Sequence, residues 1–402
     1  MTEAASRELD FTCQYSSNLP QVLQQLNISL VFTSYQAGRL MVVRSDGQQL
    51  DVNFKSFPRP MGLAATDEGL TLGIFTQVLH FQREDGLLPQ IKRPLASIEE
   101  DITAPRLHDA VKESEGDAPA TTELSKEQQQ ENELWQRQQE ALLAPLDQRI
   151  DGCYISRSAH YTGMINIHDI DWGDEGLWVV NSSFSCLCTL EPDYSFVPRW
   201  KPHFISDLVA EDRCHLNGMT LRNGKPAYVT TFSTANEKAH WRKGAAFDGT
   251  VMDVEHNEIL LRGLVMPHSP RWYNNRLYFC NSGEGQVCSL DPVSGKLETL
   301  LEAPGFTRGM TFCGPLLIVG LSKVRQSDVT RPAPLARRHQ ETFSGLWIFN
   351  LDTHQEVGHI QFTGNVDQIY DVAVLPDCHF PELIEPSHPR MRNHFSHPAL
   401  QS

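Results

Sequence analysis

The stretch HDIDWGDEGLWVVNSSFSCLCTLEPD (His168–Asp193) returns later in the chain as HSPRWYNNRLYFCNSGEGQVCSLDPV (His268–Val293). Each copy begins with histidine, passes a polar turn into an apolar run, crosses a small polar loop and enters a second apolar run. Short apolar runs separated by such turns are typical of β-structure. A third copy, HLNGMTLRNGKPAYVTTFS (His215–Ser233), follows the same course. Internal repeats of this kind indicate a solenoid or a propeller.

Weaker copies begin at three further positions, so the sequence contains six repeat starts. In chain order these starts are Arg59, His168, His215, His268, Phe306 and Gln368. Too few residues follow Gln368 to complete a repeat, whereas the segment after Ser29 resembles the missing later strands. Joining both ends of the chain in one blade removes the open sheet edges of a linear stack. We therefore predict an all-β fold, a six-bladed β-propeller closed by both termini.

The propeller is expected to span residues 28–385, after an N-terminal segment (1–27) and before an irregular, proline-containing tail (386–402). An acidic stretch at about 95–150 interrupts the first repeat. Its first part has the polar, charged composition of disorder, and its second part is typical of a helix capped by Ser125. We predict a partly helical, partly disordered insertion, which is either a passive elaboration or an arm that docks a partner.

Two long loops are expected on the rim where the innermost strands begin. They cover residues 233–249 and 322–343 and connect the second and third strands of their blades. Loops at that rim lie over the mouth of the central channel, so we predict that both act as lids.

Composition argues against several classes of function. The formal net charge of −16 at pH 7 disfavours nucleic acid or an anionic membrane as a general partner, because both attract basic surfaces. The nine cysteines form no CxxC pair, and several lie in apolar runs, as is typical of a reducing compartment. The sequence has neither a membrane-spanning apolar stretch nor a secretory pattern at its start. We expect a soluble, cytoplasmic protein.

The repeat pattern resembles a bacterial family of conserved hypothetical β-propeller proteins, over most of the chain outside the insertion. The motifs that carry this resemblance are Tyr161–Ile170, Cys214–Met219, Pro267–Trp272, Phe306–Met310 and Ile369–Val372. In architecture the chain is also similar to the calcium-dependent phosphotriesterase and gluconolactonase propellers. That similarity implies a metal at the axis, which those proteins hold through Glu, Asn and Asp, whereas histidines stand at the corresponding places here.

The three histidine starts are the candidate metal ligands. The first strand of each propeller blade lines the channel, so His168, His215 and His268 should point inward from three adjacent blades. Neutral imidazoles suit zinc, iron, copper, manganese or nickel better than calcium or magnesium. A three-histidine site also leaves coordination positions open, as a catalytic metal requires. We predict a divalent transition metal that activates water for hydrolysis, or dioxygen if it is redox-active.

Alternation along the inner strands suggests the catalytic neighbours. Asn217, Arg308 and Tyr370 each lie two residues after a repeat start, so they should share its face. Arg308 suits a carboxylate or phosphate. Asp169 flanks His168 on the opposite face of the strand. It is a candidate for orienting a metal-ligating side chain without contacting the metal itself.

The substrate-binding candidates come from the repeat starts and the rim loops. They are Arg59, Tyr35, Trp241, Arg242 and Gln368. These residue types suit a polar substrate, with Trp241 as an apolar wall. The sequence thus predicts a metal-dependent enzyme for a small polar molecule or a peptide side chain, either a hydrolase, which the fold similarity favours, or an iron or copper oxygenase. A non-enzymatic propeller that binds a peptide or protein on the same face is the alternative.

Overall fold

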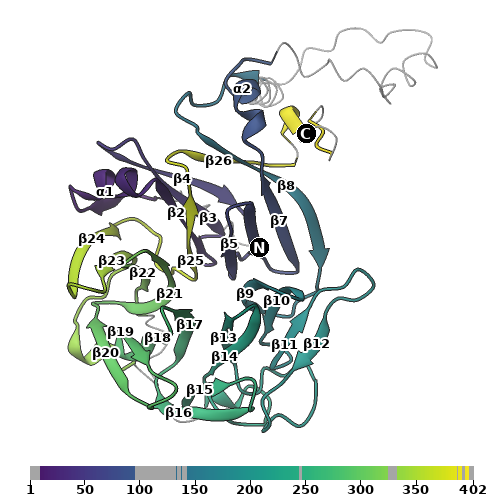
Figure 1. The fold of residues 1–402 in the computed structure, drawn as a ribbon, viewed down its shortest axis with the longest axis vertical. Coiled ribbons are helices and arrows are strands. Elements are labelled where there is room, and N and C mark those ends of the chain that lie inside the picture. Colours follow the sequence, from purple (N-terminus) through teal and green to yellow (C-terminus); the bar gives the residue numbers. More distant parts are fainter. Residues whose placement is uncertain are drawn as a thin grey trace.

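The computed structural model describes residues 10–95, 143–243, 247–324, 333–386, 388–391 and 394–397, together with Glu133 and Arg137. Its strands form six sheets that stand around a central axis like the blades of a propeller (Figure 1). The predicted six-bladed β-propeller is confirmed. Each sheet has its sequence-predicted repeat start at or just before its innermost strand.

The first three blades follow one another from residue 63 to residue 264. From the axis outward, blade 1 contains β5 (Leu63–Ala65), β6 (Gly69–Gly73), β7 (Gln77–Arg83) and β8 (Gly152–Tyr161). Blade 2 contains β9 (Ile167–Gly173), β10 (Gly176–Asn181), β11 (Cys186–Thr189) and β12 (Val197–Trp200). Blade 3 contains β13 (Leu216–Arg222), β14 (Lys225–Thr231), β15 (Gly249–Asp253) and β16 (Glu258–Leu264).

The next two blades complete the regular part of the ring. Blade 4 contains β17 (Pro267–Tyr273), β18 (Arg276–Asn281), β19 (Gln286–Leu290) and β20 (Leu297–Glu302). Blade 5 contains β21 (Phe306–Cys313), β22 (Leu316–Ser322), β23 (Gly345–Asn350) and β24 (Gln355–Phe362).

Blade 6 joins the two ends of the chain, as predicted. Its innermost strand is C-terminal and its outer strands are N-terminal: β25 (Val372–Pro376), β2 (Ile28–Ser34), β3 (Arg39–Ser45) and β4 (Leu50–Ser56). The joint is antiparallel, with Val31 opposite Ala373. Every blade therefore has covalently connected neighbours around the ring, and no gap is left between first and last.

The described part of the N-terminal segment, residues 10–27, packs on the ring, although the sequence analysis placed it outside the propeller. Strand β1 (Cys13–Tyr15) pairs with β24 and becomes a fifth strand of blade 5. Helix α1 (Leu19–Leu26) packs its buried Leu19 and Leu23 on the core between blades 5 and 6. These contacts cover the outer edge of one blade, which would otherwise expose unpaired backbone groups.

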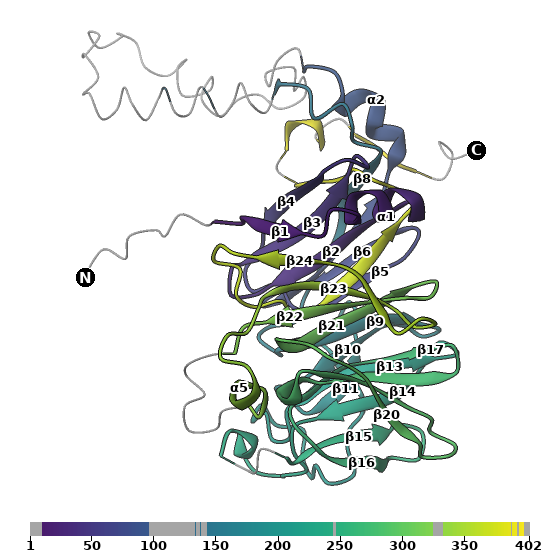
Figure 2. The same cartoon turned by 90° about the vertical axis from the view of Figure 1, so that its left-hand side faces the viewer.

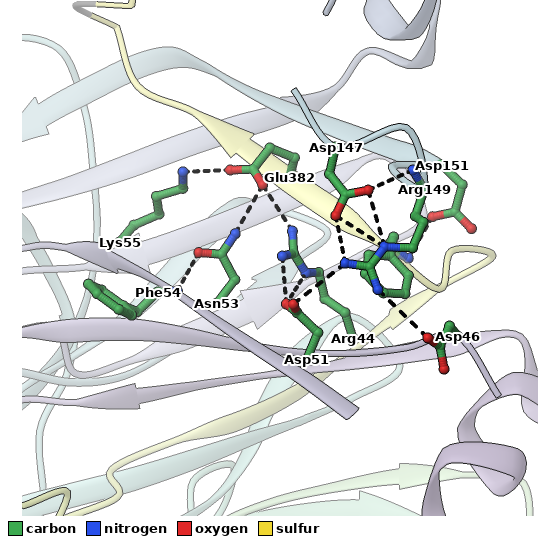
Figure 3. Close-up of polar contacts among 11 residues, drawn as sticks. Arg44, Asp46, Asp51, Asn53, Phe54, Lys55, Asp147, Arg149, Asp151 and Glu382 are labelled. Atoms are coloured by element: carbon green, nitrogen blue, oxygen red, sulfur yellow. Dashed lines mark hydrogen bonds and ion pairs between the residues drawn. The ribbon is translucent and has the colours of Figure 1, made fainter. Parts of the chain in front are cut away.

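At the other end of the chain, β26 (Pro381–Ile384) pairs in parallel with β8 and becomes a fifth strand of blade 1. Glu382 in β26 is only 7% exposed. Its carboxylate accepts a hydrogen bond from Arg44 at 3.0 Å and lies 2.5 Å from the Lys55 ammonium, while Arg44 also pairs with Asp51 at 2.6 Å (Figure 3). This network, here called the Glu382 network, ties blade 1 to blade 6 by charge as well as by packing.

The hydrophobic core lies between neighbouring blades. For example, Leu40 of blade 6 and Leu72 of blade 1 belong to one buried cluster, because inward-facing side chains of the two sheets meet. Each fully buried leucine or valine contributes about 1.5–3 kcal/mol to folding. All nine cysteines are free, and seven are buried, Cys186 and Cys280 among them. They fill the core as small apolar side chains, which agrees with the interpretation from the sequence.

The two predicted lid loops do lie at one rim. The first contains the short helix η2 (His240–Arg242), and the second contains α5 (Leu335–Arg338), which stands at the edge of the ring in the side view (Figure 2). The acidic insertion lies between β7 and β8, after the short helices η1 (Asp85–Leu87) and α2 (Leu88–Ile91). Most of it, including the helix predicted from Ser125, lies outside the described residues.

The last short helix is η5 (Pro389–Met391) in the tail. Among the described helices, none has the length and apolar character required to span a membrane.

Candidate functional site

A cavity of about 290 Å³ lies at the rim where the innermost strands begin. We call it the channel-mouth cavity. All six blades contribute to its wall, because each brings the start of its inner strand or a neighbouring loop to the axis. The residues that line it are Tyr35, Arg59, Met61, His168, His215, Phe232, Trp241, Arg242, Met266, His268, Phe306, Arg308, Lys323, Val324, Ala333, Gln368 and Tyr370.

The cavity brings together most of the residues selected from the sequence. The three histidines, both proposed aromatic contacts from the loops, and the candidates on blades 1, 5 and 6 all line it. Two proposed catalytic residues, Asp169 and Asn217, do not. Lys323, Val324 and Ala333 of the second lid loop form part of the wall, so the described part of this loop lies at the channel mouth.

Two of the histidines are held in the same way. His168 Nδ1 lies 2.8 Å from the carbonyl oxygen of Asn166, and His268 Nδ1 lies 2.8 Å from that of Met266. Asn166 and Met266 both have positive φ, 53° and 48°, and each turn directs its carbonyl at the ring two residues later. A carbonyl oxygen only accepts hydrogen bonds, so Nδ1 carries the proton in both rings. The lone pair of the neutral imidazole is therefore on Nε2.

The third histidine donates its Nδ1 proton to a carboxylate. His215 Nδ1 lies 2.9 Å from Asp212 Oδ1, and the indole N–H of Trp241 donates to Asp212 Oδ2 at 3.1 Å. One carboxylate thus orients both rings, whose centroids are 4.1 Å apart. Among the described residues, no protein group is hydrogen-bonded to Nε2 of any of the three histidines. All three Nε2 atoms are left for the cavity.

The three rings are not evenly spaced. His168 and His215 are direct neighbours, with ring centroids 4.7 Å apart in an edge-to-face arrangement. The Phe232 ring touches His215 on one side, at 4.5 Å, and His268 on the other, at 5.2 Å. In the described part of the chain, no group of three or more His, Cys, Asp or Glu side chains converges closely enough to hold a metal ion. His268 thus faces the cavity from beyond Phe232.

Burial sets the protonation of this site. It lowers the pKa of His168 and of His268 well below the usual value, and the neighbouring Arg308 guanidinium lowers both further. Both rings are therefore neutral at physiological pH, and their Nε2 lone pairs do not have to be freed from a proton.

Arg308 lies against aromatic rings. Its guanidinium carbon is 3.8 Å from the centroid of Tyr370 and 5.5 Å from that of Tyr35. Gly309 (φ +73°) lets the backbone of β21 pass close to Asp371, the residue after Tyr370, because a Cβ there would lie 2.7 Å from the Asp371 backbone. Burial lowers the pKa of Arg308 and raises that of Tyr370. The Tyr35 hydroxyl donates to Gln368 at 3.3 Å, which fixes the remaining side of the cluster.

Asp169 belongs to a network below the cavity. Its carboxylate lies 2.8 Å from Arg271, which also pairs with Asp371 at 3.2 Å, and it accepts a hydrogen bond from the Met219 N–H at 3.0 Å. We call these three charged residues the Arg271 network. Because Arg271 and Asp171 line a second cavity farther along the inner strands, the network forms a floor between the two. In this geometry the Asp169 carboxylate contacts Arg271 and the Met219 N–H and does not line the channel-mouth cavity.

Asn217 is buried, and its Nδ2 has no hydrogen-bond partner among the described residues. Alternation along β13 placed it beside His215. The pairing of β13 with β14 shifts register between Leu216 and Gly218, however, and such a bulge redirects a side chain.

The sequence analysis did not select Phe232 or Asp212. Phe232 follows the second strand of blade 3, and its backbone N–H is bonded to the His215 carbonyl. The antiparallel pairing of first and second strands was the signal that could have located it, because the end of the second strand always returns to the start of the first.

Comparison with known proteins supports the predicted family resemblance in its general form. The family model described as "Domain of unknown function (DUF4915)" matches residues 17–106 and 118–384. A search of curated proteins gives no match. Among solved structures, the chain is similar to one from "Crystal structure of Nidogen/Laminin Complex", with a TM-score of 0.44 and 9% identity, covering 87% of this chain and 99% of that one.

Proposed function

This chain belongs to the DUF4915 family, and we propose that its channel-mouth cavity is the active site of a metal-dependent enzyme that acts on a small polar molecule. The observation that carries this proposal is the common state of three histidines from three adjacent blades. Each holds its Nδ1 proton on a protein acceptor and has its Nε2 without a protein partner among the described residues.

That state is what metal coordination needs. A metal-ligating histidine donates its other ring N–H to a carbonyl or carboxylate, which fixes the tautomer and the orientation of the ring. Neutral rings also bind a metal without first releasing a proton. A histidine with a purely structural role would need no more than one such hydrogen bond at Nδ1. Three histidines at the same repeat position indicate a function that they share.

The residues fit the metal in their chemistry, and the position of His268 sets a condition. His168 and His215 already lie side by side, so a metal would be held first by this pair. His268 would become the third ligand if its ring turned past Phe232. The Phe232 ring contacts His215 on one side and His268 on the other. Bound there, a zinc ion would supply an activated water for hydrolysis, and iron or copper would supply oxygen chemistry. The resemblance to the calcium-dependent phosphotriesterase and gluconolactonase propellers favours hydrolysis.

The test is metal analysis of full-length protein purified without a polyhistidine tag, before and after incubation with zinc, iron(II), copper and manganese. We expect about one transition metal per chain, lost in His168→Ala, His215→Ala and His268→Ala. His80→Ala is the matched control, because His80 is also partly buried and hydrogen-bonded, to Thr71, outside the cavity. Folded wild-type protein that takes up no metal would overturn the proposal, and the identity of the metal separates hydrolase from oxygenase.

A further inference from the structure

We infer that the channel-mouth cavity selects a small organic anion, a carboxylate or a phosphate ester, with Arg308 as the receptor of the anionic group. The inference takes the cavity to be the substrate site, as the proposed function does, and it deepens that function by naming the substrate class. Its physical basis is the charge of the wall and does not involve a metal.

The wall of the cavity carries one sign of charge. Four cationic side chains line it: Arg59, Arg242, Arg308 and Lys323. None of its described lining residues is Asp or Glu. The chain as a whole has a formal net charge of −16, so this concentration of positive charge runs against the average surface. A concave site lined by one sign of charge focuses its field and attracts ligands of the opposite sign.

Two of these four charges are already balanced by the protein. Lys323 pairs with Asp367 at 2.6 Å, and Arg242 lies 3.9 Å from Asp212. Within the described residues, neither Arg308 nor Arg59 pairs with a carboxylate; Arg59 instead lies over the Phe75 ring at 5.9 Å. The unbalanced positive charge of the cavity therefore lies on Arg308 and Arg59.

Arg308 is the stronger candidate of the two. Its Nε is fully buried, without a hydrogen-bond partner among the described residues. A guanidinium stays protonated in proteins, so this buried donor belongs to a half-buried cation that pairs with no carboxylate among the described residues. Such an arrangement is costly for a folded protein unless a further partner compensates it. The planar fork of a guanidinium matches the two oxygens of a carboxylate or phosphate.

The surroundings of Arg308 place an anion next to the histidines. Tyr370 touches Arg308 with its ring face at 3.8 Å and touches His168 at a centroid distance of 5.7 Å. An anionic group on Arg308 is therefore one aromatic ring away from His168. Phe306 and Trp241 supply apolar walls, and the volume of about 290 Å³ admits a small molecule and excludes a folded chain. The ligand class is an anionic head on a small organic body.

The experiment is calorimetric titration of chelator-treated, full-length protein at low salt with four probes: succinate, benzoate, inorganic phosphate and phenyl phosphate. Because a hydrogen-bonded charge contributes about 1.5–3 kcal/mol, Arg308→Gln should weaken the binding of the best probe by at least about tenfold. Arg308→Lys keeps the positive charge and loses the bidentate geometry of the guanidinium, so its affinity for the probe should lie between those of wild type and Arg308→Gln. The matched control is Arg222→Gln, since Arg222 also lies over aromatic rings, Tyr228 and Trp272, but outside the cavity.

Preference for succinate or benzoate would assign a carboxylate substrate, and preference for either phosphate would assign a phosphate substrate. If no probe binds, or if Arg308→Gln, folded by circular dichroism, binds as well as the control, the inference is overturned. The two proposals fail separately. Protein that binds a probe but never takes up metal sinks the proposed metal enzyme alone, and metal-loaded protein that binds no probe sinks the anion site alone.

Discussion

The rings of His168 and His215 lie edge-to-face with their centroids 4.7 Å apart, yet their Nδ1 protons go to different acceptors. His168 uses a backbone carbonyl, from Asn166, whereas His215 uses the carboxylate of Asp212. A carboxylate makes the opposite ring nitrogen a stronger ligand than a carbonyl does. Of these two acceptors, only Asp212 can be changed by mutation without rebuilding the backbone.

Replacing Asp212 should therefore weaken metal binding without unfolding the blade. We expect Asp212→Asn to lower the affinity for zinc about 10–100-fold, the usual cost of losing an outer-shell carboxylate. Asparagine tolerates the positive φ of 49° at this position, so the loop should keep its shape. Competition with a chelator measures the affinity. The control is Asp207→Asn, on the same loop and paired with Arg213; equal affinities in both variants would contradict the prediction.

The Arg271 network should be needed for stability. Replacing Arg271 with methionine leaves two buried carboxylates, Asp169 and Asp371, without their cation. Breaking a buried ion pair from one side costs about 3–5 kcal/mol, and urea denaturation should show a loss of that size. Arg199→Met is the comparison, because Arg199 makes an exposed pair with Glu191 and such pairs contribute at most about 1 kcal/mol. Similar losses in the two variants would contradict a structural role for the floor.

The sequence was sufficient to predict that the three histidines meet in space, because every blade of a propeller has the same geometry. Once His168, His215 and His268 occupy the same position of the repeat, ring closure brings them to one cavity however far apart they lie in the chain. Arg308 and Tyr370 were found by the same rule. What alternation cannot foresee is a break in strand register, and Asn217 lies at such a break.

The packing between blades was equally hidden from the sequence. Phe232 separates His215 from His268 only because the second strand of blade 3 returns to the axis there. Asp169 pairs with Arg271 from two blades away, a contact that no local pattern encodes. Spacing within one repeat predicts which positions face the channel, and the partner of each side chain depends on the neighbouring blades.

The Glu382 network should stabilise the joint between blades 1 and 6. Glu382→Gln removes the charge that Arg44 and Lys55 share (Figure 3), and Arg44 keeps Asp51 as a partner. Because only part of the network is lost, we expect a decrease of about 1–3 kcal/mol in the free energy of unfolding. Denaturant titration measures it. Glu298→Gln, at a more exposed pair with Arg276, should change stability much less, and a reversed order would contradict the interpretation.

Asp171 should make the stability of the protein depend on pH. Its carboxyl lines the second cavity, where burial raises its pKa to about 6 while Arg271 opposes the rise. In the unfolded chain an aspartate titrates at about 3.9. The native state therefore holds this proton more tightly, so the stabilisation is complete below about pH 4 and is lost as the pH rises toward 6.

Asp171→Asn removes this titration and keeps the side-chain oxygen that accepts a hydrogen bond from the Trp172 N–H at 2.9 Å. With a discount for the partial exposure of Asp171, the variant should be about 1–2 kcal/mol more stable than wild type at pH 8 and no more stable at pH 4. Unfolding in urea across this range provides the measurement, with Asp193→Asn on an exposed turn as the control. A variant that is destabilised equally at every pH would contradict the prediction. It would mean that Arg271 stabilises the ionised carboxylate more than burial destabilises it.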